Sequence, residues 1–199
     1  MRTFLSSQRK VMVAAGVFLT AVLVLALTFS STSIAASNKG ASYAKFNDKG
    51  ELLRPEGYRE WVYVGTPVTP NDMNGGKAPF PEFHNVYIDP ASYKEYRKTG
   101  KFRNGTILVK ELVSVGSKEA TSGKGYFMGE FIGLEATVKD STRFKAEPGN
   151  WAYFSFTESK GKKTAKAFPA AACNACHDGS AAEDWVFTQF YPVLRAAKP

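Results

Sequence analysis

The sequence predicts an α+β fold: a β-rich antiparallel sheet domain with a few short helices and a C-terminal segment that holds both cysteines. Runs rich in valine, isoleucine and aromatic residues are separated by glycine- and proline-rich turns. One helix signal stands between these runs and another follows them. Hydrophobic residues make up 44% of the chain and aromatic residues 14%, which is enough to build the core of one domain.

Residues 1–35 are typical of a signal peptide. A basic start precedes an uncharged run over residues 11–29, and small residues follow up to Ala36. This order predicts cleavage after Ala35 or Ala36 and a periplasmic location for the rest of the chain. The alternative is an uncleaved membrane anchor, because the run over residues 11–29 is nearly long enough to span a bilayer.

Residues 36–57 are a polar, turn-rich segment, and residues 58–199 form the predicted main domain. Residues 58–65 have the composition of a strand. Four prolines and two adjacent glycines predict a loop over residues 67–81, and residues 83–88 again read as a strand.

A short helix is predicted over residues 91–98. Asp89 stands at the N-cap position, Pro90 at the first helical position and Gly100 just beyond the end. After a turn at Asn104-Gly105, the remaining strands are predicted at residues 106–115, 126–138 and 151–157. Residues 117–124 should be a loop, and residues 182–197 look helical with an interruption at Pro192.

The charge of the chain argues against a nucleic-acid-binding protein. The formal net charge is +8, and it falls to +5 without residues 1–35, which carry three basic residues and no acidic ones. The lysines are scattered, and no basic helix or aromatic-interleaved strip stands out. A solvated basic surface is the simplest interpretation, with weak docking of an acidic redox partner as a further option.

Both cysteines lie in one motif, Cys173-Asn-Ala-Cys176-His177. Two thiols at this spacing can add to the two vinyl groups of one haem, and the adjacent histidine then reaches the iron as proximal ligand. The motif therefore predicts one covalently attached haem c with His177 as the metal ligand. A disulfide is allowed in an oxidising compartment but needs no His177. A zinc site needs four ligands, and only His84 is left to join.

The sequence leaves the sixth coordination position of the iron undecided. The protein candidates are His84, Met73, Met128 or a lysine, and otherwise the position is open to a small molecule. A methionine ligand would indicate an electron carrier, whereas an open position indicates gas binding or catalysis.

Lys110 stands in a strand that is apolar on both faces, between Leu108 and Leu112 on its own face. A lysine in such a place is costly unless it is paired, neutralised or modified. From the pattern alone, the better interpretation is an edge strand whose lysine reaches solvent along its apolar stem.

The following strand has alternate residues Phe127, Gly129, Phe131, Gly133 and Glu135. Two glycines on one row let a flat group approach the backbone, and the phenylalanines beside them suit a porphyrin. Glu135 would then be a carboxylate in apolar surroundings and a candidate proton acceptor. A solvent-exposed strand-end glutamate is the alternative, and Glu130 on the opposite row is the rival carboxylate.

With these residues, the chain resembles the cytochrome P-460 family, c-type haem proteins of ammonia- and methane-oxidising bacteria, from about Phe46 to Lys198. The matching segments are Tyr58-Arg-Glu-Trp-Val, Val86-Tyr-Ile-Asp-Pro90, Val109-Lys-Glu-Leu112, Tyr126-Phe-Met-Gly129, Gly133-Leu-Glu135, Glu147-Pro-Gly-Asn-Trp151, Cys173-Asn-Ala-Cys176-His177 and Phe190-Tyr-Pro-Val-Leu-Arg195.

The resemblance implies a β-rich homodimer whose haem carries an extra bond from a lysine side chain to a meso carbon of the porphyrin. That lysine matches Lys110, which reverses the interpretation from pattern alone, and the distal carboxylate matches Glu135. The family oxidises hydroxylamine to nitrous oxide, which implies a five-coordinate haem and a redox-partner cytochrome. His84 falls where a distal-pocket residue is expected, as ligand, hydrogen-bond donor or bystander.

Three functions therefore compete. The first is periplasmic hydroxylamine oxidation at a lysine-crosslinked haem. The alternative is a cytochrome of the c-prime-beta type, which captures nitric oxide without turnover, lacks the crosslink and has a wholly apolar distal pocket. The third is a plain electron carrier with a methionine or histidine sixth ligand. Lys110 and Glu135 favour the enzyme.

Overall fold

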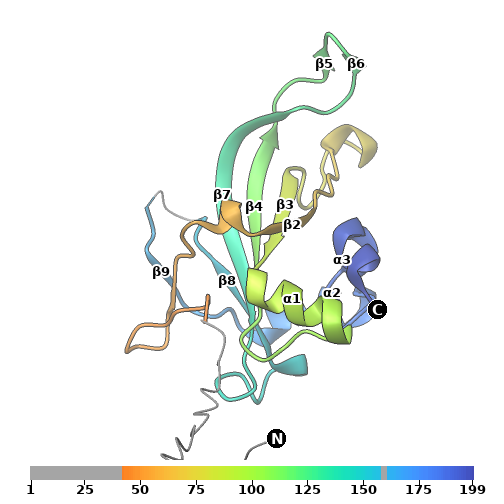
Figure 1. The fold of residues 1–199 in the computed structure, drawn as a ribbon. Helices are drawn as coiled ribbons and strands as arrows, with labels where there is room; N and C mark the ends of the chain where they lie inside the picture. The colour runs from red at the N-terminus through yellow and green to blue at the C-terminus, as the bar shows by residue number, and fades with distance from the viewer. Residues whose placement is uncertain (1–41, 158–160) are drawn as a thin grey trace, which may run out of the picture. The chain divides into compact units, whose positions relative to one another are not determined.

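The computed structural model describes residues 42–157 and 161–199, so the predicted signal peptide lies outside the described residues. Five strands form one antiparallel sheet in the order β2-β3-β4-β7-β8 (Figure 1). They are β2 (Val62–Gly65), β3 (Phe83–Ile88), β4 (Ile107–Val115), β7 (Met128–Lys139) and β8 (Trp151–Ser155). The prediction of a β-rich α+β fold with antiparallel pairing is confirmed.

Shorter elements surround this sheet. Two further strand pairs are β1 (Leu52–Leu53) with β9 (Thr164–Ala165), and β5 (Glu119–Ala120) with β6 (Gly123–Lys124). The α-helices are α1 (Pro90–Thr99), α2 (Ala170–Ser180) and α3 (Pro192–Ala197). Within the described residues, single 3₁₀ turns lie at Tyr58–Glu60, Asn71–Met73, Pro148–Asn150 and Thr188–Phe190.

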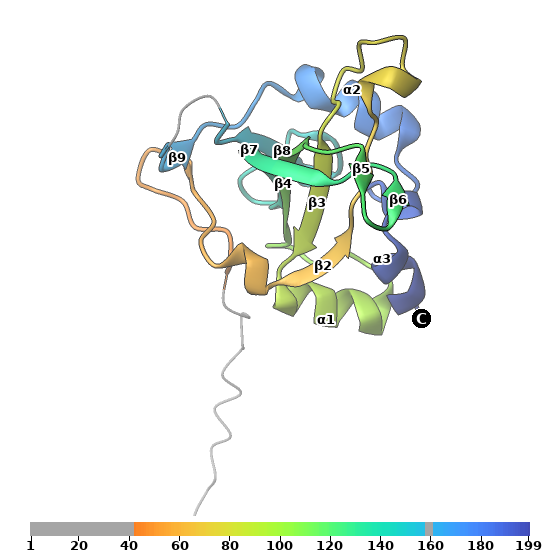
Figure 2. The same cartoon turned by 90° about the horizontal axis from the view of Figure 1, so that it is seen from above.

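Each face of the sheet buries its own core, because alternate strand residues point to opposite faces. The first core joins Val109, Leu134 and Phe154 to Leu52 of the N-terminal segment. The second core joins strand residues Val86, Leu108 and Tyr153 to residues of the helices, namely Tyr96, Leu194 and Cys173. Figure 2 accordingly shows the helices and strand β9 on different sides of the sheet. The described part of residues 36–57 is thus built into the first core.

Helix α1 confirms the predicted start and stop signals. The Asp89 side chain accepts a hydrogen bond from the Ser92 backbone N–H at 2.8 Å, and it also accepts one from the Ile107 N–H at 3.1 Å. Gly100 ends the helix in the left-handed conformation, with φ of 68°. One buried carboxylate therefore fixes both the start of α1 and the start of β4.

Three predicted boundaries are wrong for identifiable reasons. Residues 58–60 form a 3₁₀ turn instead of a strand, because the Tyr58 hydroxyl turns inward to the Glu111 carboxylate. Residues 117–124 contain the β5–β6 hairpin, which projects beyond the end of the main sheet (Figure 1). Residues 182–197 are α-helical only from Pro192, after the 3₁₀ turn at Thr188–Phe190, because proline is well suited to the first turn of a helix, where its missing N–H has no intrahelical partner.

Glu111 is the centre of a buried polar cluster on the first-core face, with 4% of its surface exposed. Its carboxylate accepts hydrogen bonds from the Tyr58 hydroxyl and the Arg59 Nε at 2.8 Å each, and from the Asn85 Nδ2 at 3.3 Å. Burial alone would raise the pKa of Glu111, but the hydrogen bonds from Arg59, Tyr58 and Asn85 outweigh it and lower that pKa. The cluster therefore stabilises the fold only while Glu111 is ionised.

We expect Glu111→Gln to lower the free energy of unfolding at neutral pH by about 1–3 kcal/mol, because hydrogen bonds to a buried charge are weakened. Since the folded-state pKa lies below the unfolded one, this stabilisation is present above about pH 4.5 and is lost as the pH falls further. In denaturant unfolding at a series of pH values, the free energy of unfolding of the variant should fall less steeply with decreasing pH than that of the wild type. Glu60→Gln, at an exposed position, is the control. An equal loss of unfolding free energy at acid pH in the wild type and in Glu111→Gln would contradict this account.

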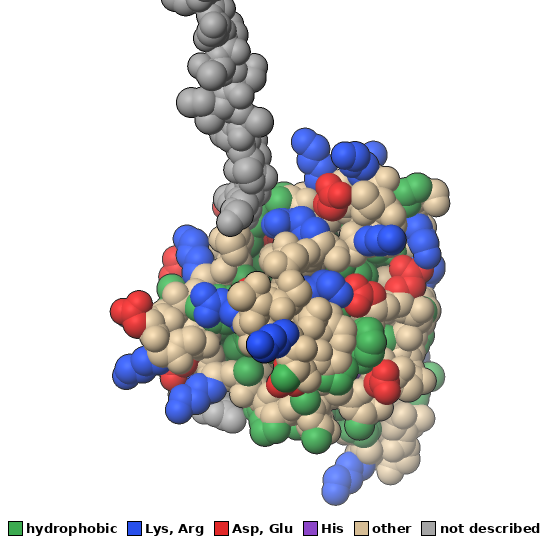
Figure 3. Space-filling model, turned by 90° about the horizontal axis from the view of Figure 1, so that it is seen from below, with side chains coloured by type: hydrophobic (Ala, Val, Ile, Leu, Met, Phe, Trp, Pro, Cys, Tyr) green, Lys and Arg blue, Asp and Glu red, His purple; other side chains and the backbone are tan. Residues whose placement is uncertain are grey.

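The surface carries scattered charge. On the face drawn in Figure 3, lysine and arginine side chains lie singly or in small groups among acidic and polar residues. Within the two described ranges, no helix is both long and apolar enough to cross a membrane. The apolar run at residues 11–29 lies outside those ranges.

Candidate functional site

Helix α2 carries the whole cysteine–histidine motif. Cys173 and Cys176 are three residues apart, so one helical turn brings both thiols to the same side of the helix. Both thiols are free, with Cys173 half-buried against the second core and Cys176 exposed. Burial raises the pKa of the Cys173 thiol, the charge of Glu135 raises it further, and the charge of Lys110 opposes this. The motif therefore lies within electrostatic reach of both predicted strand residues.

The ring of His177 is fixed by its surroundings. Its Nδ1 lies 2.7 Å from the backbone carbonyl oxygen of Trp185, and its ring centroid is 4.6 Å from that of Tyr153 and 4.7 Å from that of Phe187. A carbonyl can only accept, so Nδ1 carries the hydrogen and Nε2 keeps its lone pair. Burial lowers the pKa of His177 despite the hydrogen bond to Trp185, and the Lys110 charge adds to the lowering. Neutral imidazole with a free Nε2 is the form that binds iron.

The Trp185 carbonyl that contacts His177 belongs to a residue with an uncommon backbone conformation. Its φ is 60°, in the left-handed region that residues other than glycine rarely adopt. The Trp185 ring packs over Gly149, where any Cβ would collide with it. The local strain is thus held by packing, as is frequent where a side chain is positioned for function.

Lys110 and Glu135 form an ion pair on the second-core face of the sheet. They are direct partners in the β4–β7 register, and Lys110 Nζ lies 2.6 Å from Glu135 Oε2. The two side chains are 30% and 31% exposed. Strand β4 is in the middle of the sheet, so the edge-strand interpretation of Lys110 is wrong. The apolar surroundings expected for Glu135 are also wrong, because a lysine ammonium faces it.

The predicted row of phenylalanines beside Glu135 does not exist. Leu112 pairs with Gly133, but the next residue, Val113, pairs with Phe131, so a β-bulge at Ile132 breaks the alternation. Phe131 therefore turns to the first-core face, where the Arg54 guanidinium lies 6.0 Å from its ring centroid. Gly133 keeps the register predicted relative to Glu135.

Phe127 also lies away from Glu135. It precedes β7 beside the β5–β6 hairpin, where its N–H donates to the Ser117 carbonyl at 2.9 Å. At about 3.3 Å per strand residue, it stands roughly 25 Å along the chain from Glu135. Glu130 is exposed, and its backbone N–H donates to the Ser114 hydroxyl at 2.8 Å. The structure therefore brings Glu135 to Lys110 and leaves Phe127 and Glu130 apart from them.

The two methionines considered as iron ligands lie elsewhere. The Met128 sulfur is 3.7 Å from the Asn85 Nδ2, on the face of the sheet that Glu111 occupies. Met73 is 74% exposed in a 3₁₀ turn of the proline-rich loop. Neither position favours a methionine-ligated electron carrier.

His84 lies on the same face of the sheet as Lys110. It is two residues from Val86, the strand partner of Lys110, and its own partner is Leu112. Its Nε2 is buried without a hydrogen-bond partner and lies 3.7 Å from Glu82 Oε1. Burial, followed by the positive charge of Lys110, lowers the pKa of His84 to about 4.

Phe80 joins Lys110 and His84, and sequence reasoning missed it. Lys110 Nζ lies 5.5 Å from the Phe80 ring centroid, and the Phe80 and His84 ring centroids are 6.2 Å apart. Phe80 is nevertheless 55% exposed. It lies in the proline-rich loop, where no alternation of residues could have marked it as part of a site.

These residues fit a haem group. One helix presents two free thiols and a histidine with an available Nε2, and a half-buried Lys110–Glu135 pair and exposed aromatic rings lie nearby. Exposed Phe80 and Phe190, the latter stacked on the His177 neighbour Phe187, offer apolar surface for a porphyrin. Two thiols and one histidine on a single helix are the donor set of covalent haem attachment.

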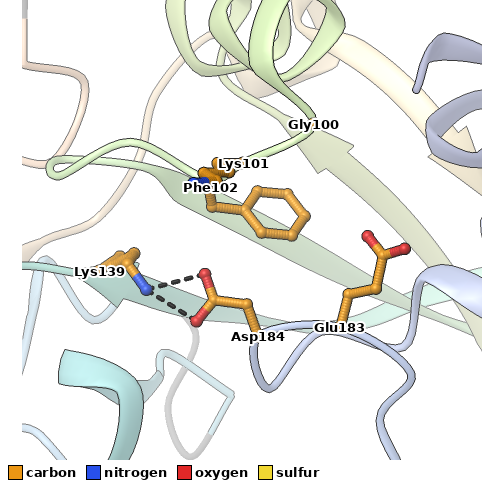
Figure 4. A pocket seen from close by; sticks show the side chains of 6 residues that line it. All are labelled: Gly100, Lys101, Phe102, Lys139, Glu183 and Asp184. Atoms are coloured by element: carbon orange, nitrogen blue, oxygen red, sulfur yellow. Dashed lines mark hydrogen bonds and ion pairs between the residues drawn. The ribbon is translucent and has the colours of Figure 1, made fainter. Parts of the chain in front are cut away.

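A cavity of about 390 Å³ is lined by other residues, namely Gly100, Lys101, Phe102, Lys139, Glu183 and Asp184 (Figure 4). Three of its charged side chains already have partners: Lys139 Nζ lies 2.7 and 2.8 Å from the two Asp184 oxygens, and the Tyr96 hydroxyl donates to Glu183 at 2.8 Å. None of the predicted site residues lines it. We interpret these contacts as structural.

Comparison with known proteins supports the haem assignment. A family model, cytochrome P460, matches residues 55–188. A search of curated proteins found no match. The members of this family are haem proteins, and hydroxylamine oxidation is the known activity of the family. Because the match covers well over half of the chain and includes Lys110, Glu135 and the cysteine motif, this protein belongs to the cytochrome P460 family.

Proposed function

We propose that this protein is an exported c-type haem enzyme that oxidises hydroxylamine to nitrous oxide and related nitrogen oxides. The observation that carries the proposal is the ion pair of Lys110 and Glu135 at 2.6 Å, within electrostatic reach of Cys173 and His177. Membership of the cytochrome P460 family supports the same activity.

In this proposal, each site residue has one role toward the haem. Cys173 and Cys176 hold it through thioether bonds, and His177 Nε2 ligates the iron. Lys110 would hold the ring through a bond from its nitrogen to a meso carbon, and in that bonded form the nitrogen would be a neutral secondary amine instead of a costly half-buried ammonium. The haem supplies an iron that binds hydroxylamine and takes up its electrons.

A Lys110 bonded to the haem would leave Glu135 without its cation. The ammonium that lies 2.6 Å from the carboxylate in the unmodified chain would be absent, so Glu135 would be available to accept protons from the substrate. Two hydroxylamine molecules give one nitrous oxide and one water with loss of equal numbers of electrons and protons. Glu135 takes the protons, and a redox-partner cytochrome takes the electrons.

The same pair argues against a nitric-oxide-binding cytochrome of the c-prime-beta type. Such a protein is expected to have an apolar distal pocket, whereas Lys110 and Glu135 bring a charged pair to the candidate site. The proposal also includes a periplasmic location, from the export signal in residues 1–35, and a homodimer. Hydroxylamine and nitric oxide are its small-molecule ligands.

Two measurements on the purified haem-loaded protein test this function. We expect a proteolytic peptide containing Lys110 to be recovered joined to the haem peptide of residues 173–177. We also expect hydroxylamine to reduce an artificial electron acceptor with release of nitrous oxide, followed by gas chromatography. A separate Lys110 peptide together with nitric oxide binding and no hydroxylamine oxidation would instead establish the c-prime-beta type of function.

A further inference from the structure

Glu82 and His84 form a second acid–base pair beside the candidate site. Glu82 Oε1 lies 3.7 Å from His84 Nε2, and their side chains are only 12% and 16% exposed. Two titratable groups buried this deeply are costly unless each compensates for the other. Sequence reasoning had no signal for Glu82, which stands in the proline-rich segment just before β3.

The pair connects the candidate site to a cavity. On one side, His84 shares the face of Lys110 and contacts Phe80, which also contacts the Lys110 ammonium. On the other side, Glu82 lines a cavity of about 270 Å³ together with Ser114, Lys118 and Ile132. A space of this volume holds several water molecules. His84 and Glu82 thus lie in series between the Lys110–Glu135 pair and a water-accessible space.

The charges that face His84 come from Glu82 in the preceding loop and Lys110 on β4, with Glu135 on β7 paired to Lys110. In the unmodified chain, burial and the Lys110 ammonium keep His84 neutral, with a pKa of about 4. Loss of the Lys110 charge on capture of its amine removes one of these two effects. The carboxylate of Glu82 then remains as the nearby charge, and it favours a protonated imidazole.

We propose that His84 and Glu82 form a proton relay that carries protons from the haem-side pocket to the adjacent cavity. This inference rests on the proposed function, and it adds a second proton path to the role of Glu135. With Nε2–H directed toward Glu82, the His84 Nδ1 lone pair accepts one proton from the pocket. Nε2 then releases one proton to the Glu82 carboxylate, which passes it to water, and the imidazole returns to neutral. No electron is transferred in these steps.

Carbon monoxide bound to the reduced, haem-loaded protein is a suitable probe, because its C–O stretching frequency depends on the charge of the pocket and no turnover is needed. The C–O stretching frequency should show a pH transition in the wild type that is still present in Glu135→Gln. His84→Gln should remove that transition. Glu82→Gln should move it to lower pH by about 1–3 units, because a carboxylate within 4–6 Å stabilises the imidazolium. The exposed Glu119→Gln is the matched control and should leave the transition unchanged.

Kinetics give a second readout. We expect kcat for hydroxylamine in Glu82→Gln and His84→Gln to fall by about 10-fold or more, with KM unchanged, because proton removal is affected and substrate binding is not. An unshifted C–O transition in Glu82→Gln, or a transition that persists in His84→Gln, overturns the relay while leaving the proposed function intact. A reduced protein that takes up no carbon monoxide overturns the proposed function and the relay with it.

Discussion

Replacing Lys110 with leucine is expected to convert the absorption spectrum of the reduced protein into that of an ordinary c-type cytochrome and to abolish hydroxylamine oxidation. A bond from the lysine amine to a meso carbon interrupts conjugation of the ring, so the reduced protein should otherwise absorb far to the red. Leucine cannot form this bond. It should still fit, since Lys110 lies among Val86, Leu108 and Leu112.

The control for this variant is a lysine with the same pairing in another part of the molecule. Lys198 Nζ lies 2.5 Å from Glu183 Oε1, close to the separation in the Lys110–Glu135 pair, but in the C-terminal part of the chain. Lys198→Leu should keep both the red-shifted spectrum and turnover. A Lys110→Leu protein with unchanged colour, measured by absorption spectroscopy after reduction, would rule out the lysine crosslink.

The sequence predicted those parts of the site that depend on local chemistry. The spacing of Cys173, Cys176 and His177 indicates haem attachment without knowledge of the fold, because one turn of a single helix is enough to place the three side chains next to one another. Helix α1 was equally predictable, since Asp89, Pro90 and Gly100 act on backbone groups within a few residues. The pairing of Lys110 with Glu135 was not contained in the pattern, because register is a property of two strands that are distant in sequence.

Other parts of the site depend on packing that no local pattern carries. The bulge at Ile132 moves Phe131 to the opposite face, and a second register shift between Val113 and Val115 changes the alternation again before Met128. The partner of His177 is a backbone carbonyl, that of Trp185, which any residue type would supply. Glu82 and His84 are two residues apart, so their pairing is local, but their burial beside Lys110 depends on the packing of β3 against β4. Such contacts require the tertiary structure.

Replacing Glu135 with glutamine is expected to lower kcat for hydroxylamine by about 100- to 10,000-fold, the usual contribution of a positioned proton acceptor. The glutamine side chain has nearly the same shape as that of glutamate. Its amide oxygen can still accept a hydrogen bond from Lys110 and so can still orient the lysine toward the porphyrin ring. The red-shifted spectrum should therefore remain, which separates proton transfer from assembly of the crosslink. Steady-state kinetics and the spectrum of the reduced protein are measured on the same preparation.

Glu130→Gln is the matched control, since it changes the same type of residue in the same strand, β7, at an exposed position. It should keep both activity and colour, because its carboxylate has no contact with Lys110 that would place it near the substrate. A fully active Glu135→Gln would exclude Glu135 as the base, and a loss confined to Glu130→Gln would transfer that role to Glu130. Loss of the red-shifted absorption in Glu135→Gln would instead indicate that the carboxylate orients the Lys110 amine. The ion pair at 2.6 Å would then be required for formation of the lysine–haem crosslink.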